Sequence, residues 1–119
     1  GAGSFSLVFL SLKGKYFNIT HAHNLPLELA YNYGIPLAIV LLTTVLLVLV
    51  KSSKIIYSYK KSFDNIINKA WLASTIIVLF AHLSDVTYYD GRISISCWIL
   101  LAGLKTIIDT DKNLKRIEK

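Results

Sequence analysis

Two histidines separated by one residue, His21 and His23, are the side chains best suited to chemistry in this chain. Imidazole titrates near neutral pH, so it can serve as a general base, a metal ligand or a contact to phosphate. A His-x-His pair supplies two metal ligands, whereas zinc needs three or four, and the surrounding segment adds only Glu28 and no cysteine. The spacing therefore favours no metal site. An interfacial histidine without a chemical role is the alternative.

The residues after His23 predict a short helix that would position it. Asn24 is a typical N-cap residue, and Pro26 fits the first turn of a helix. Gly34 and Pro36 then predict a break or kink before the next apolar run. His23 would consequently lie at the amino-terminal end of a helix, where an anionic group is favoured.

The composition of the 119 residues indicates one domain of an integral membrane protein. Hydrophobic residues make up 54% and charged residues 17%, against roughly 45–50% and about 25% in soluble domains. So apolar a chain is not disordered, and the single cysteine, Cys97, excludes an intrachain disulfide framework. Motifs such as GxxxxGK[ST], GxSxG and CxxC do not occur, so nothing indicates a common soluble enzyme.

Three apolar runs predict an all-α membrane fold with about three transmembrane helices and an outer-face loop that contains the short helix. The uncharged run 29–50 has 22 residues, or about 33 Å of helix, which is enough to cross a hydrocarbon core of roughly 30 Å. Further spans are expected at 70–89 and 93–108, joined by a tight turn at 90–92.

The distribution of the +6 net charge predicts how these spans are oriented. Segment 51–69 has five lysines and segment 105–119 has five basic residues, while the rest of the chain has three. By the positive-inside rule the loop 51–69 and the tail 109–119 are cytoplasmic, and the loop 1–28 is outside. Apolar residues within the loop 51–69 recur at helical spacing among lysines, which indicates either an amphipathic helix on the inner leaflet or a helical extension of the second span. The basic residues lie beside the apolar runs and do not line one helix face together with aromatic residues. We therefore expect no nucleic-acid partner.

His82 and Asp85 form a second candidate pair, near the outer end of the second span. They are three residues apart and therefore share a helix face. Ionisable residues within a span are candidates for function. Solvation at the membrane surface is the alternative for both.

His23 and Asn24, followed after nine residues by Gly34, resemble the His-[Asn/Ser/Gln]-x9-Gly motif of the O-antigen ligase and O-antigen polymerase family. Members are polytopic glycosyltransferases of the bacterial inner membrane. Residues 1–5, Gly-Ala-Gly-Ser-Phe, are similar to a glycine-rich stretch before the family's histidine, and the three-span order also agrees. Leu37 stands where the family often has a small residue or tyrosine, so the motif does not separate ligase from polymerase.

This resemblance implies transfer of a glycan from undecaprenyl diphosphate to an acceptor hydroxyl outside the membrane, without cofactor or metal. The expected partners are a lipid-linked glycan donor, an acceptor (the lipid A core for a ligase, another glycan for a polymerase) and membrane lipids. His23 would activate the acceptor or contact the diphosphate, Asn24 would orient the helix start and contribute to substrate binding, and His21 would flank the site as a substrate-binding candidate.

The family's diphosphate-neutralising arginines belong to an earlier outer loop, which this chain does not contain. We therefore expect the chain to be the C-terminal part of a longer multi-pass protein, inactive alone, with a cytoplasmic C-terminus. A membrane transporter or a non-catalytic scaffold is the alternative from a different functional class.

Overall fold

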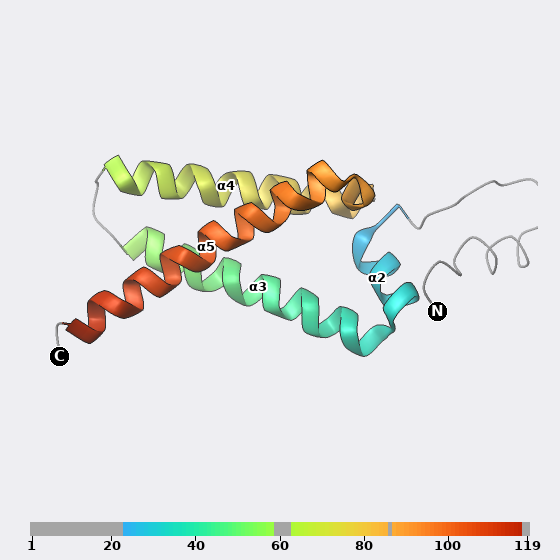
Figure 1. Cartoon of the computed structure of the whole chain (residues 1–119), viewed down its shortest axis with the longest axis horizontal. Helices are drawn as coiled ribbons and strands as arrows, with labels where there is room; N and C mark the ends of the chain where they lie inside the picture. The colour runs from blue at the N-terminus through green and yellow to red at the C-terminus, as the bar shows by residue number, and fades with distance from the viewer. Residues whose placement is uncertain (1–22, 59–62, 86, 118–119) are drawn as a thin grey trace, which may run out of the picture.

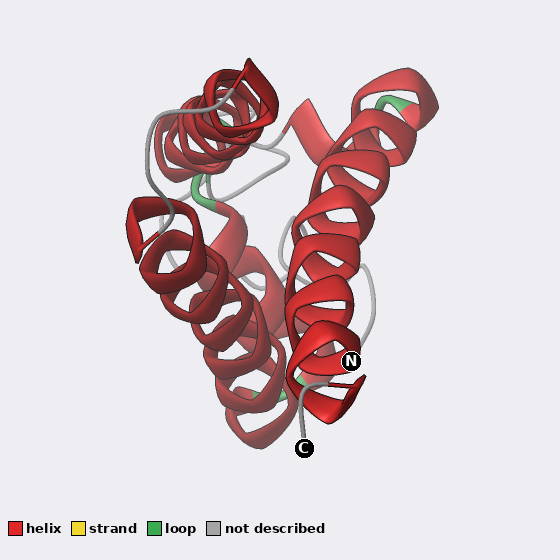
Figure 2. Ribbon diagram, turned by 90° about the vertical axis from the view of Figure 1, so that its left-hand side faces the viewer, coloured by secondary structure: helices red, strands yellow, loops and turns green. Residues whose placement is uncertain are grey.

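The described chain is a bundle of three long helices with one short helix across an end (Figures 1 and 2). The computed structural model describes residues 23–58, 63–85 and 87–117. In chain order the elements are α2 (Leu25–Tyr33), α3 (Ile35–Ser58), α4 (Phe63–Ser84), the 3-10 turn η1 (Thr87–Tyr89) and α5 (Gly91–Ile117). Helices α3, α4 and α5 are each long and apolar enough to cross a membrane. The predicted all-α, three-span fold class is confirmed.

The apolar run expected as one span over 29–50 is divided at Gly34. Its φ of 92° is a backbone conformation that residues with a Cβ rarely adopt, so α2 ends there. The Gly34 N–H still donates to the carbonyl of Ala30 at 3.0 Å, which satisfies one of the last carbonyls of α2. The membrane helix α3 therefore begins at Ile35, and the predicted break at this position is confirmed.

Helical structure also extends into the segment 51–69, the expected cytoplasmic loop, and the start of α4 agrees with the expected alternative of a helical extension of the second span. Helix α3 continues to Ser58, and α4 already begins at Phe63. Segment 51–69 contains neither glycine nor proline, which is consistent with helix in its described parts, 51–58 and 63–69. The last helix likewise continues past 108 to Ile117.

The buried core lies where the carboxyl-terminal half of α3 contacts α4 and α5. Ile56, Leu72 and Leu104, one from each of these helices, are almost fully buried together, and Trp71 packs against them. Most other large apolar side chains of the three helices face outward, which is the arrangement expected for helices that contact lipid. The carboxyl ends of α3 and α5 and the start of α4 gather at the end opposite α2 (Figure 1).

Gly103 lets α5 approach α4 closely. The Trp71 indole lies against Gly103, and its N–H donates to the carbonyl of Leu100 at 2.9 Å. A Cβ at residue 103 would overlap the indole ring. A small residue at a helix crossing is a common device in membrane proteins, because it allows two backbones to come together.

We predict that Gly103→Leu destabilises the bundle by about 1–3 kcal/mol, the usual cost of overpacking. The indole would be displaced, so the emission of Trp71 would shift when it is followed in a Trp98→Phe background during denaturation in detergent. Gly91→Leu is the matched control, because nothing lies within 4 Å of a Cβ at that glycine. Equal stability of the two leucine variants would contradict the close approach at Gly103.

Candidate functional site

Asn24 starts α2 and also attaches it to α4. Its backbone is extended (φ −155°, ψ 113°), and its Oδ1 accepts a hydrogen bond from the N–H of Leu27 at 3.1 Å. The same amide donates through Nδ2 to the carbonyl of Leu83, 3.0 Å away at the end of α4. The predicted N-cap is confirmed, with Pro26 in the first turn. Asn24 therefore holds two helix ends together.

His23 lies beside Asp85, which directly follows α4. The distance from His23 Nδ1 to Asp85 Oδ1 is 3.2 Å, and both side chains are exposed, by 64% and 62%. His23 has φ 48°, a left-handed conformation that histidine tolerates better than most residues. Because a carboxylate only accepts hydrogen bonds, this contact requires the proton on Nδ1. In the neutral ring the lone pair is then on Nε2, which is the nitrogen that can accept a proton from a substrate.

A polar stripe formed by Asn24, Glu28 and Asn32 runs along one face of α2. These residues are four apart, which places them above one another on the helix. Glu28 and Asn32 are only 4% and 7% exposed. Asn32 Nδ2 donates to Glu28 Oε1 at 2.7 Å, and the Tyr89 hydroxyl in η1 donates to the same oxygen at 3.2 Å. Asn32 Nδ2 also lies 3.3 Å from the Tyr89 hydroxyl.

The polar stripe thus connects α2 to the turn between α4 and α5. Asn24 contacts the end of α4, and Glu28 with Asn32 contacts η1 one and two helical turns further along. A buried carboxylate is tolerated when donors surround it, which the Asn32 amide and the Tyr89 hydroxyl provide. His23, directly before the stripe, is positioned by this attachment.

His82, the other histidine that the sequence singled out, is buried inside the bundle and only 2% exposed. Its Nδ1 lies 2.6 Å from the carbonyl of Val78, one turn earlier in α4, and its ring meets the edge of Tyr88. The described contacts of His82, a hydrogen bond along α4 and a ring contact with Tyr88, therefore both lie within the bundle. Asp85, by contrast, contacts His23, which directly precedes the distant helix start at Asn24.

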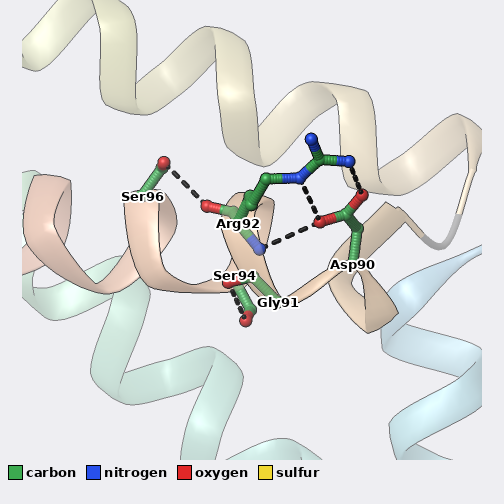
Figure 3. Close-up of polar contacts among 5 residues, drawn as sticks. All are labelled: Asp90, Gly91, Arg92, Ser94 and Ser96. Atoms are coloured by element: carbon green, nitrogen blue, oxygen red, sulfur yellow. Dashed lines mark hydrogen bonds and ion pairs between the residues drawn. The ribbon is translucent and has the colours of Figure 1, made fainter.

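Arg92 is engaged by Asp90 at the start of α5 (Figure 3). The side-chain Nε and a terminal nitrogen of Arg92 lie 3.3 and 3.2 Å from the two carboxylate oxygens of Asp90. The backbone N–H of Arg92 also donates to Asp90 Oδ1, at 2.9 Å. The side-chain contact with Arg92, followed by its backbone N–H, lowers the pKa of Asp90. The guanidinium is therefore paired with the Asp90 carboxylate at the start of α5.

Two of the predicted site residues, His23 and Asn24, lie together at this end of the bundle, whereas His21 and residues 1–5 lie outside the described residues. Sequence reasoning did not find Glu28, Asn32 and Tyr89, although the four-residue spacing of Asn24, Glu28 and Asn32 was a visible signal. Within the described ranges, no group of three His, Cys, Asp or Glu side chains could hold a metal ion.

Comparisons with models of protein families, with curated proteins and with solved structures found no match to this chain. A fold alone does not identify an activity, since one fold hosts many functions. The function is therefore inferred from the side chains at the α2 end and from the motif that they form.

We predict that the hydroxyl of Tyr89 loses its proton at a higher pH than that of an ordinary tyrosine. Burial, and then the negative charge of Glu28 together with the hydrogen bond to it, raise the pKa of Tyr89. Because the folded pKa is raised, the hydroxyl contact stabilises the fold fully below the ordinary value of about 10 and is lost as the pH rises through the higher folded value. Subtracting the alkaline absorbance titration of Tyr89→Phe from that of the native chain isolates this residue. A difference curve centred at or below pH 10 would show that the contact with Glu28 is not made.

Proposed function

We propose that the chain forms the acceptor-activating part of a membrane glycosyltransferase similar to the O-antigen ligases, with His23 as the general base. The observation that carries this proposal is the contact between His23 Nδ1 and the Asp85 carboxylate at 3.2 Å. An imidazole oriented by a carboxylate through one nitrogen, with the other nitrogen free, is an established arrangement for taking a proton from a hydroxyl.

In the proposed reaction Nε2 of His23 accepts the proton of the acceptor hydroxyl. The hydroxyl oxygen attacks the anomeric carbon of the donor glycan and forms the new glycosidic bond. The bond from that carbon to the diphosphate oxygen breaks, and undecaprenyl diphosphate leaves with the electron pair. Asp85 stabilises the imidazolium that forms, because its carboxylate accepts the hydrogen bond from Nδ1. Asn24 keeps the start of α2 in place through Leu83.

The donor diphosphate requires cations that this proposal assigns to another part of a longer protein. Arg92, the arginine nearest to the site in sequence, already faces Asp90. Bidentate contacts between guanidinium groups and phosphate suit the neutralisation of a diphosphate. An earlier outer loop, as implied by the resemblance, would supply them.

The charge distribution supports an outer location for the site, in the bacterial inner membrane that the resemblance implies. Lysines such as Lys51, Lys54 and Lys112 belong to the ends of α3 and α5, which gather opposite α2 (Figure 1). The positive-inside rule places that end in the cytoplasm and the His23 end outside. Glycan acceptors such as the lipid A core would then meet His23 at the outer surface.

An O-antigen polymerase would use the same residues with a lipid-linked glycan as acceptor, so the product separates the two activities. The transporter alternative has less support, because two hydroxyls inside the described spans are bonded within their own helices. Thr44 donates to Val40 and Thr75 donates to Trp71, each at 2.8 Å. A transporter is expected to present free polar groups near the middle of the membrane.

We predict that His23→Ala in the complete protein lowers the transfer rate by about 10²- to 10⁴-fold, the usual contribution of a general base. Asp85→Asn should cause a smaller loss, because the imidazole remains but its orientation is no longer held by a charge. The assay follows transfer from undecaprenyl-diphosphate-linked glycan in membranes by gel, with lipid A core or a second lipid-linked glycan as acceptor.

Asp109→Asn serves as the matched control, because this acid forms an ion pair with Lys105 in α5, far from His23 in the fold. It should transfer at the native rate, and all variants should insert into the membrane equally. Native transfer by His23→Ala would contradict the assigned role.

A further inference from the structure

Helix α2 has its polar residues buried and its apolar residues exposed, which is the reverse of a helix on a water-facing surface. Glu28 and Asn32 of the polar stripe are 4% and 7% exposed, whereas Leu27 is 61% and Tyr33 57% exposed. Leu27 precedes Glu28 and Tyr33 follows Asn32, so each is turned about 100° from its polar neighbour. The exposed positions therefore flank the polar stripe on its two sides.

The exposed faces of α2 have no charge that would favour water. Glu28 is the one ionisable acid or base in the sequence LPLELAYNY, apart from tyrosine, and its carboxylate is directed to Asn32 and Tyr89. Burying apolar surface is worth about 25 cal/mol per Å², so leaving it in water is unfavourable. A contiguous exposed apolar surface of this kind marks contact with a partner or a membrane.

The exposed apolar residues of α2 are followed directly in the chain by those of a membrane span. A single residue, Gly34, joins α2 to α3, and the first residues of α3, including Ile35 and Leu37, are also exposed and apolar. Helix α3 is itself long and apolar enough to cross a membrane. The lipid that suits the apolar surface of α3 therefore also suits α2. Tyr33 is a residue type common at the boundary between lipid and water.

We propose that α2 is inserted in the outer boundary layer of the membrane, with Leu27 and Tyr33 in contact with lipid acyl chains and the polar stripe sealed against α4 and η1. The partner of this surface is the lipid itself. The inference rests on burial and continuity with α3, and holds whether or not the chain transfers glycans. If the proposed function is also correct, His23 and Asp85 lie at headgroup depth, where the reactive groups of lipid-anchored substrates are found.

Site-directed spin labelling of the chain tests this insertion. Leu27→Cys and Tyr33→Cys are each made in a Cys97→Ala background, labelled, and reconstituted into vesicles of phosphatidylethanolamine and phosphatidylglycerol. Collision of the label with oxygen, which concentrates in lipid, is compared with collision with a water-soluble nickel chelate. Lys112→Cys is the matched control, because Lys112 is exposed near the carboxyl end of α5, at the end of the bundle opposite α2.

We expect both α2 labels to collide strongly with oxygen and weakly with the nickel chelate, while the Lys112→Cys label shows the reverse. Strong collision of the α2 labels with the chelate would place α2 in water and overturn the proposal. Weak collision with both reagents would show that protein covers α2, and this result would overturn it as well. Neither outcome depends on enzymatic activity, so the proposed function is tested separately.

Discussion

The buried carboxylate of Glu28 is the constraint on which the α2 end of the molecule depends. A carboxylate that is 4% exposed must be surrounded by donors, because an unpaired buried charge is strongly unfavourable. Asn32 supplies one donor from the next turn of α2, and Tyr89 supplies another from η1. The second donor comes from 61 residues further along the chain, so this hydrogen bond holds α2 against the turn between α4 and α5.

That contact connects the fold to the chemistry at His23. Once the polar stripe is docked, Asn24 reaches the carbonyl of Leu83 and His23 reaches Asp85, so the end of α4 completes the site. The imidazole thus meets a carboxylate from a segment that is distant in sequence. The opposite end of the bundle carries lysines and the apolar core that packs the three long helices together. The two ends of the molecule therefore differ in chemistry.

Local signals predicted most of the secondary structure. Asn24 and Gly34 delimit α2 because an N-cap amide and a left-handed glycine act on their immediate neighbours. The apolar runs likewise predicted the three spans. Helical spacing of apolar residues within 51–69 left two alternatives, an amphipathic helix on the inner leaflet or an extension of the second span, and the start of α4 at Phe63 agrees with the extension. The continuation of α3 to Ser58 was not predicted, because the lysines after Val50 were interpreted as the start of a loop. The contact of His23 with Asp85 was not predictable, since it depends on how two helix ends dock.

The most direct test of this account is the tautomer of His23, measured by solid-state nitrogen NMR on histidine-labelled chain in membranes. The His23 signal is identified by its loss in His23→Ala. At a pH where the ring is neutral, the account predicts a proton on Nδ1, an unprotonated Nε2 and a through-space correlation to the Asp85 carboxyl carbon. A proton on Nε2, or no correlation with Asp85, would contradict the orientation of the proposed base.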